Sequence, residues 1–271
     1  MTKKVLFRFD VDTVSCIKYG VPKLVNISNK YDVDFNIFMN FGRSVDRKEI
    51  LKRKNKSSKG VENKLSTISK LGLINYMLTI LVNPKLDKYK DEIELLMNSK
   101  NEIGLHGGLN HGTWQLNGHN FDIKRLEKEI NYGLEKAKKY NITFAGFTSP
   151  GMISNKLLGD LLTLKNFKYI SDTFTFEKQS SEDSKKMILK GIKNINVNLS
   201  GPRGEGYFEY YLSKKLEPIK IKEKLLKQII NTDEDIFVIY DHPLIIKFID
   251  REFIDLIKEL KKREIKILKF S

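Results

Sequence analysis

The chain has 271 residues, of which 40% are hydrophobic and 31% are charged. This composition is typical of a globular protein and excludes a disordered chain, and the single cysteine, Cys16, excludes an internal disulfide. The formal net charge of +15 favours acidic partners such as nucleic acid, anionic lipid head groups or phosphorylated substrates. Part of this charge reflects a general composition that is rich in lysine and includes only two alanines, and is not evidence for a particular function.

Short apolar runs recur along the chain, and stretches with apolar spacings of three and four separate most of them. The runs predict strands and the stretches predict helices, most clearly at 121–140 and 248–264. The predicted strands span 5–11, 33–41, 102–106, 143–147, 167–171, 194–199, 236–241 and 265–270. Since strands and helices alternate and no linker or repeat divides the chain, we expect a single α/β domain over 1–271, a complete or distorted (β/α) barrel of roughly seven or eight parallel strands.

The stretch 43–85 interrupts this alternation after the second strand and is predicted to be an insertion. It opens with the basic run "RSVDRKEILKRKNKSSKG" and closes with the apolar run "LGLINYMLTILV" at 71–82, which is too short to span a bilayer. A membrane-surface or lid element fits this pattern as well as a solvated helix on the barrel does. The first apolar run is also short and is broken by Arg8 and Asp10, so we expect neither a signal peptide nor an anchor, and a cytoplasmic protein.

Polar side chains gather at the predicted C-terminal ends of three strands, where the loops of a parallel barrel form its open mouth. They are Arg8, Asp10 and Asp12 on the first strand, His106 and His111 at the third, and Asp241 and His242 at the seventh. The spacing of the first three, i, i+2 and i+4, places them on one face if the strand continues that far. A structural histidine or a helix-capping aspartate would explain each residue alone, but not their coincidence at strand ends.

An aspartate and two histidines that converge from different strands predict a divalent metal site with open positions for water and substrate. Gly107 and Gly108 would let the loop curl so that His106 and His111 face one point. The remaining aspartate is then free to act as a base in a hydrolysis. The fourth histidine, His119, lies in a polar loop and is taken as incidental.

The chain resembles the polysaccharide deacetylase (NodB-homology) superfamily, and within it the deformylases that act on 4-deoxy-4-formamido-L-arabinose linked to phosphoundecaprenol. The matching segments are "RFDVDT" (8–13), "YGVPKLVNISNKYDVDFNIFM" (19–39), "EIGLHGGLNHGTWQ" (102–115), "FKYISD" (167–172) and the strand that ends at His242. They follow the family order and span nearly the whole chain, and the stretch 43–85 has a counterpart in those deformylases. The resemblance implies the family's distorted (β/α) barrel and a divalent metal, usually zinc.

The resemblance also implies roles for individual residues. Asp10 is then the catalytic base, Asp12, His106 and His111 are the metal ligands, and His242 is the general acid that protonates the leaving amine. Two departures stand out. The histidine motif has one more residue between its ligands than the usual pattern, and the family's third motif, here "FTSPGM" at 147–152, lacks its arginine.

The substrate-binding residues expected from the same comparison are Arg8, Pro150 and Arg203. Arg8 would lie beside the base and hold it ionised by charge pairing, and Pro150 belongs to the third motif. Arg203 lies in the Gly-flanked loop "NLSGPRGEGYFEYY" at 198–211, which is also explained as an ordinary surface loop.

Three functions follow, in decreasing order of preference. The first is a metal-dependent hydrolase that removes a formyl or acetyl group from an amino sugar linked to a polyprenyl phosphate, at the inner face of the membrane. The second keeps the site and changes the substrate to a soluble or polymeric N-acetylated glycan. The third, a non-catalytic basic protein that binds nucleic acid, leaves the Asp and His pattern unexplained, and no nucleic-acid partner is expected.

Overall fold

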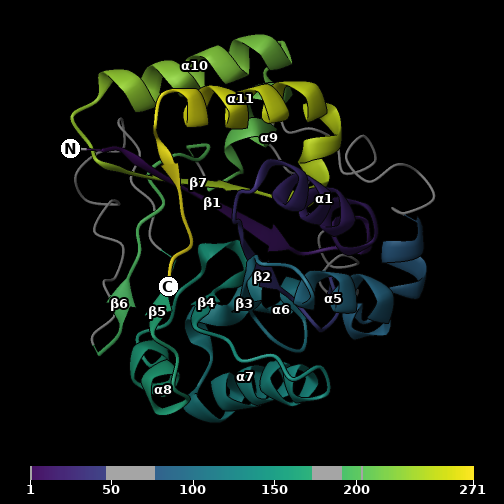
Figure 1. Cartoon of the computed structure of the whole chain (residues 1–271). Coiled ribbons are helices and arrows are strands. Elements are labelled where there is room, and N and C mark those ends of the chain that lie inside the picture. Colours follow the sequence, from purple (N-terminus) through teal and green to yellow (C-terminus); the bar gives the residue numbers. More distant parts are fainter. Residues whose placement is uncertain (1, 47–76, 173–190, 203) are drawn as a thin grey trace.

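The computed structural model describes residues 2–46, 77–172, 191–202 and 204–271. Seven parallel strands form a curled sheet in the order β6-β5-β4-β3-β2-β1-β7, with helices around it (Figure 1). The strands are β1 (Lys4–Val11), β2 (Asn36–Met39), β3 (Glu102–His106), β4 (Gly146–Thr148), β5 (Tyr169–Ile170), β6 (Lys193–Asn194) and β7 (Ile236–Asp241). The fold is therefore the predicted α/β class, a distorted (β/α) barrel.

The two edges of the curled sheet meet beyond β6. Leu199 bridges to Ile239 in β7, so the segment predicted as a strand at 194–199 is regular only at its start. Asn198 explains part of this interruption, because its side-chain oxygen accepts the N–H of Val238 in place of a backbone carbonyl. The predicted last strand, 265–270, is likewise short, since β8 spans only Lys266–Ile267. It pairs with the first residues of β1, Lys4 and Val5, and lies outside the strand order of the barrel.

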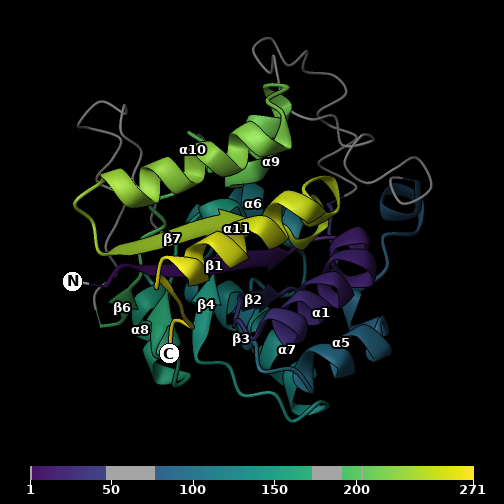
Figure 2. The same cartoon turned by 45° about the horizontal axis from the view of Figure 1, so that its top comes forward.

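Helices cover the outside of the sheet. Figure 2 shows α10 and α11 on the side of β7, and α1, α5 and α7 on the side of β2 and β3. The helices are α1 (Val21–Tyr31), α5 (Lys90–Met97), α6 (His111–Asn117), α7 (Ile123–Lys138), α8 (Leu158–Leu164), α9 (Tyr207–Ser213), α10 (Pro218–Asn231) and α11 (Asp250–Lys262), with short helical turns η1 (Cys16–Gly20), η2 (Leu78–Val82), η3 (Leu86–Lys88), η4 (Gly118–Asn120), η5 (Pro150–Met152) and η6 (Pro243–Phe248). Both predicted helices are confirmed, α7 within 121–140 and α11 within 248–264.

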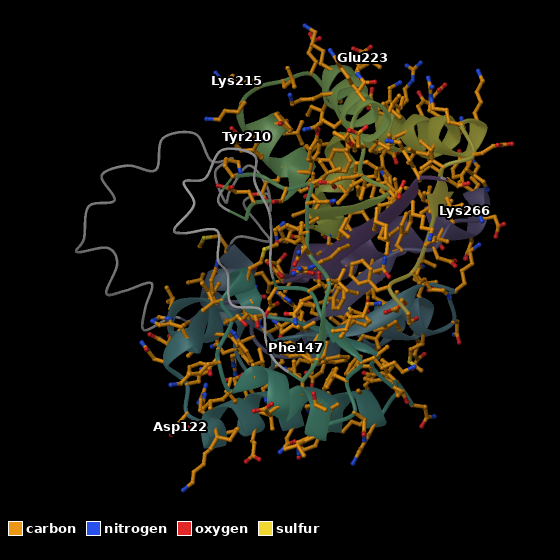
Figure 3. All side chains as sticks on the ribbon, turned by 90° about the vertical axis from the view of Figure 1, so that its left-hand side faces the viewer. Asp122, Phe147, Tyr210, Lys215, Glu223 and Lys266 are labelled. Carbon is orange, nitrogen blue, oxygen red and sulfur yellow. The ribbon has the colours of Figure 1, made fainter. Side chains whose placement is uncertain are left out.

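Strand β1 divides the core into two layers because its side chains alternate between its faces. Phe7 and Phe9 point outward and pack against Phe35 and Phe253 under the helices. On the other face Leu6 joins a second apolar cluster, inside the barrel, with Phe38, Met152, Tyr169, Val197, Val238, Tyr240 and Phe270. Figure 3 shows Phe147 among packed side chains in the interior, and Lys215, Glu223 and Lys266 at the periphery.

The inner layer positions the candidate site, because Arg8 and Asp10 share the inward face of β1 with Leu6. Both are buried, with relative exposures of 0% and 1%. Below them the interior is apolar, and above them β1 ends at Val11. Arg8 and Asp10 therefore lie close to the C-terminal edge of the sheet.

The ends of the predicted insertion 43–85 lie side by side. Arg43 and Lys85 form an antiparallel bridge, and the side chain of Asn83 bonds to both backbone groups of Val45. Residues 47–76 lie outside the described residues, so the choice between a membrane-surface element, a lid and a packed helix stays open. Over the parts of the chain that the structure describes, every helix is too short or too polar to cross a bilayer.

Candidate active site

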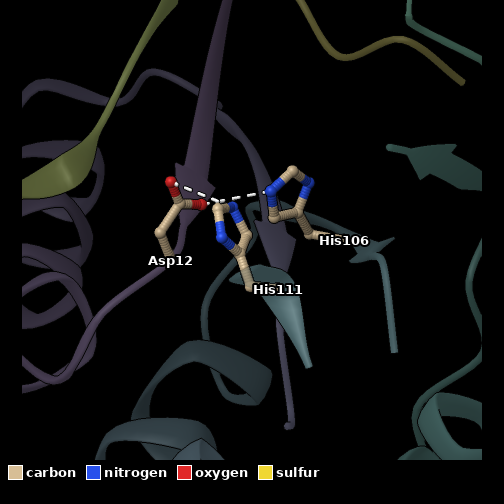
Figure 4. Close-up of side chains that lie close together, drawn as sticks. All are labelled: Asp12, His106 and His111. Atoms are coloured by element: carbon tan, nitrogen blue, oxygen red, sulfur yellow. Dashed lines mark ion pairs between the residues drawn. The ribbon is translucent and has the colours of Figure 1, made fainter. Parts of the chain in front are cut away.

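The carboxylate of Asp12 faces both predicted metal-binding histidines (Figure 4). Its Oδ1 is 3.1 Å from Nε2 of His106, and its Oδ2 is 3.3 Å from Nε2 of His111. The three side chains come from the chain just after β1, the last residue of β3 and the first residue of α6. Segments about a hundred residues apart in the sequence thus converge at the C-terminal edge of the sheet.

The loop that joins the histidines turns sharply within four residues. Gly107 has a φ of +67°, a conformation that glycine adopts without strain. Asn110 then caps α6, because its side-chain oxygen accepts the N–H of Thr113. The cap fixes the start of the helix at His111 and turns this imidazole back toward His106, with the ring centroids 5.2 Å apart.

The three side chains fit a divalent metal ion. One ligand atom from each lies within 4.8 Å of the others, and both Asp12 Oδ1 and His111 Nε2 are buried without a hydrogen-bond partner. Thr148 Oγ1 lies 2.7 Å from Nδ1 of His106, which leaves Nε2 directed at the site, as the outer partners of metal-bound histidines usually do. Two imidazoles and a carboxylate are ligands that suit zinc or a similar ion.

The electrostatics of Asp12 favour its ionised form. Burial raises its pKa, but the attraction of His111 and His242 outweighs this effect, and the pKa lies well below its ordinary value. Asp12 therefore offers a carboxylate, the form that a metal ion binds.

Arg8 and Asp10 form a buried ion pair beneath this cluster. Arg8 donates from Nε to Asp10 Oδ1 at 3.0 Å and from Nη2 to Oδ2 at 2.5 Å. The guanidinium also bonds to the carbonyl of Ser171 and lies over the rings of Phe38 and Tyr240. Burial lowers the pKa of Arg8, but pairing with Asp10 outweighs it, so the pKa is raised and the guanidinium stays charged.

His242 closes the site from the end of β7. Its Nε2 is 3.0 Å from Asp12 Oδ2 and 3.1 Å from the hydroxyl of Tyr240, and its Nδ1 is 3.0 Å from Oε2 of Glu209. Burial lowers its pKa, but Asp12 and Glu209 raise it well above the ordinary value. A partly buried imidazole with a carboxylate behind it is suited to hold and deliver a proton.

Glu209 was not among the residues predicted from the sequence. It belongs to α9, within the segment 198–211 that was singled out for Arg203. Asp241, which was noted at the strand end, does not point to the metal cluster. Its carboxylate accepts the backbone N–H groups of Phe208, Glu209 and His242, and burial raises its pKa to about 7. Asp241 thus fixes α9 onto the end of β7 and so places Glu209 against His242.

A second polar pair was also missed in the sequence. Asp172, which follows β5, accepts the backbone N–H of Ser149 at 2.6 Å, and burial raises its pKa. Its other oxygen and the hydroxyl of Ser149 are buried without partners. Ser149 belongs to the third motif at 147–152, which contains no arginine, and Asp172 binds this motif from the end of β5.

The other predicted residues differ in position. Pro150 begins η5 and packs on the histidine loop, where a Cβ at Gly107 would lie 2.6 Å from its Cγ; a direct role in substrate binding stays a prediction. Arg203 lies outside the described residues. His119 is exposed in η4, and its ring bonds to Asn120, away from the site.

A barrel with these polar groups at its mouth has the fold of carbohydrate deacetylases of known structure. A protein of Mycobacterium smegmatis assigned as a polysaccharide deacetylase is 16% identical with a TM-score of 0.59, and the match covers 100% of this chain and 95% of that one. A CE4 esterase of Streptococcus mutans is 13% identical with a TM-score of 0.57, over 99% and 87% of the two chains. A CE4 family pseudoenzyme from Bacillus anthracis is 10% identical with a TM-score of 0.54, over 98% and 63%.

These similarities define the fold, and the function has to be argued from the site. No family model matches the sequence, and no curated protein matches it. Since one protein with the same fold is a pseudoenzyme, the arrangement of side chains in this chain carries the functional argument.

Proposed function

We propose that the chain is a metal-dependent hydrolase that removes a formyl or acetyl group from the nitrogen of an amino sugar. The observation that supports it most is the convergence of Asp12, His106 and His111 with two buried ligand atoms that lack hydrogen-bond partners. Buried polar atoms are normally paired, so a cluster of unpaired ligand atoms favours an ion between them. A second carboxylate and a third histidine lie beside this cluster, as an amide hydrolysis requires.

The proposed division of labour follows the contacts. A divalent ion, most suitably zinc, held by the three ligands would polarise the amide carbonyl and make a water molecule more acidic. Asp10, held by Arg8, accepts the proton of the attacking water. His242 donates a proton to the amine as it leaves, and Glu209 holds the ring in the orientation for that transfer.

The approach of substrate has to displace one contact. Nε2 of His242 bonds to Asp12 Oδ2 and lies near the hydroxyl of Tyr240. An ion held by Asp12 would compete with this contact, and Nε2 of His242 would then be available to the leaving amine.

For the finer assignment we propose a substrate linked to a polyprenyl phosphate, as in the deformylases that the sequence resembles. The formal net charge of +15 supports an anionic substrate and contact with the inner face of a membrane. The alternative is an N-acetylated glycan that is soluble or polymeric, and the name of the M. smegmatis protein, a polysaccharide deacetylase, favours it.

Metal analysis and turnover in matched histidine variants test the proposal. We expect the purified protein to bind zinc, and His106→Ala to lose both the metal and the hydrolysis of a formamido or acetamido sugar. His119→Ala, which removes an exposed histidine outside the site, is the control and should keep both. Assays on lipid-linked and free amino-sugar amides separate the two substrate classes, and full activity of a metal-free protein would refute the mechanism.

A further inference from the structure

The loop between the two histidines rests on the side of helix α7. A Cβ at Gly108 would lie 2.1 Å from the carbonyl oxygen of Glu129, so the backbones of loop and helix are in direct contact. At this point the backbone N–H of Leu109 donates to Oε2 of Glu129 at 2.5 Å. A carboxylate from a remote helix thus binds the middle of the segment that joins His106 to His111.

Glu129 occupies a position where helix packing alone favours an apolar side chain. It is fully buried, on the face of α7 that also buries Leu126, Ile130, Gly133 and Ala137. Burial of a carboxylate is unfavourable unless its oxygens are paired. The second oxygen, Oε1, accepts from Nη2 of Arg125 at 2.5 Å, so each oxygen has a donor and the carboxylate is held in one orientation.

The opposite side of the loop is held by the backbone of Arg43 and by the side chain of Asn110, whose Nδ2 donates to the carbonyl of Val45 at 3.2 Å. Arg43 donates its N–H to the carbonyl of Leu109 at 3.0 Å and accepts the N–H of His111 at 2.8 Å. Both backbone groups of Leu109 therefore have partners from outside the loop, one from the edge of the insertion and one from α7. Of the two contacts made by the backbone of Leu109, only that with Glu129 comes from a side chain and can be removed by substitution.

We propose that Glu129 is a positioning residue for the metal centre, which fixes the loop so that His111 faces His106 across Asp12. This inference rests on the proposed metal-dependent function. Glu129 itself touches neither the ligand atoms nor the substrate, and it acts through the backbone of Leu109. Without its carboxylate the backbone of Leu109 keeps one outside partner of two, and the spacing of the three ligand atoms is less firmly fixed.

Zinc affinity, measured by competition with a chromophoric chelator, tests this role directly and needs no substrate. Glu129→Leu should raise the Kd for zinc by about 10- to 100-fold, the usual effect of losing an outer partner of a metal ligand. Glu129→Gln keeps an acceptor oxygen but loses the charge, and should raise the Kd by a smaller factor, more than about threefold. Glu127→Leu and Glu127→Gln are the controls, because Glu127 is exposed on the same helix, and both should bind zinc like the unaltered chain.

The outcomes separate this inference from the proposed function. If the unaltered chain binds no zinc, the metal-dependent function fails and the positioning role fails with it. If it binds zinc and folded Glu129→Leu binds equally well, only the positioning role is overturned. Should Glu129→Leu not fold, Glu129→Gln decides, and a Kd within about twofold of the unaltered value overturns the role.

Discussion

Replacement of Arg8 by methionine tests whether the buried ion pair under the site is a structural requirement of the barrel. Methionine replaces the aliphatic part of the arginine side chain and removes the guanidinium, which lies over Phe38 and Tyr240. The change leaves Asp10 as a buried carboxylate without its bidentate partner, since Arg8 supplies both of the hydrogen bonds that it accepts at 3.0 and 2.5 Å.

The expected loss of stability follows from the burial of the pair. The side chains are 0% and 2% exposed, so solvent does not screen the interaction. Two unit charges about 4 Å apart attract by about 4 kcal/mol at an effective dielectric constant of about 20, and removal of one partner from a buried pair typically costs about 3–5 kcal/mol. A domain has a free energy of unfolding of about 5–15 kcal/mol, so Arg8→Met should remain folded but lose a large part of its stability.

Urea unfolding of a double-mutant cycle separates charge pairing from packing. In the double variant Arg8→Met with Asp10→Asn, a neutral amide replaces the unpaired carboxylate. We expect more than about 2 kcal/mol of the lost free energy of unfolding to be recovered. Lys258→Met is the control, since its pair with Asp255 is exposed and should contribute less than about 0.5 kcal/mol. A loss below about 1 kcal/mol for Arg8→Met, or no coupling with Asp10, would contradict the assigned role of the pair.

Three further changes test other parts of the site. Glu209→Gln should lower kcat by about 10- to 100-fold with little change in KM, because His242 loses the carboxylate that orients it; an equal rise in KM would point to substrate binding instead. Gly108→Ala should destabilise the fold by about 1–3 kcal/mol in urea unfolding, because its Cβ would meet the backbone of Glu129, and an unchanged midpoint would speak against the tight packing of this loop. Burial raises the pKa of Asp241 to about 7, above its value in the unfolded chain. Its contribution to the free energy of unfolding is therefore complete below about pH 4 and is lost as the pH rises to about 7, by up to about 1.4 kcal/mol per pH unit. Asp241→Asn should remove this dependence on pH, and identical pH profiles of the free energy of unfolding for the two proteins would exclude the assigned contribution of Asp241.

The sequence was sufficient to predict those parts of the site that depend on local periodicity. Arg8 and Asp10 lie two residues apart on one strand, and alternation alone places them on the same face. His106 and His111 follow a short apolar run that ends in glycines, which marks a strand end and a turn. Because the C-terminal ends of parallel strands lie at the same edge of the sheet, both histidines are expected near Asp12, and the structure places them there.

The residues that support the site could not be predicted in this way. Glu129 lies in a helix that carries many other charged residues, and no spacing distinguishes this buried glutamate from exposed ones such as Glu127. Glu209 is the one charged residue of the short helix α9, but the sequence does not show that this helix packs against the end of β7. Their partners are about 20 to 33 positions away along the chain, and the contacts exist only after helices and strands have packed. Strand lengths were overestimated for a related reason, since apolar runs such as 265–270 continue into the core after pairing has ended.

The assignment of the two aspartates to different tasks follows from where β1 stops pairing. Asp10 is still opposite Phe38 in the ladder with β2, so its backbone is fixed and its side chain is held against Arg8 inside the barrel. Asp12 follows the last paired residue, Val11, and turns toward the histidines at the mouth. A carboxylate locked to a guanidinium is a poor metal ligand, because its oxygens already accept hydrogen bonds, whereas Asp12 has an oxygen without a hydrogen-bond partner. The end of a single strand thus separates a candidate base from a candidate ligand that lies two residues further along.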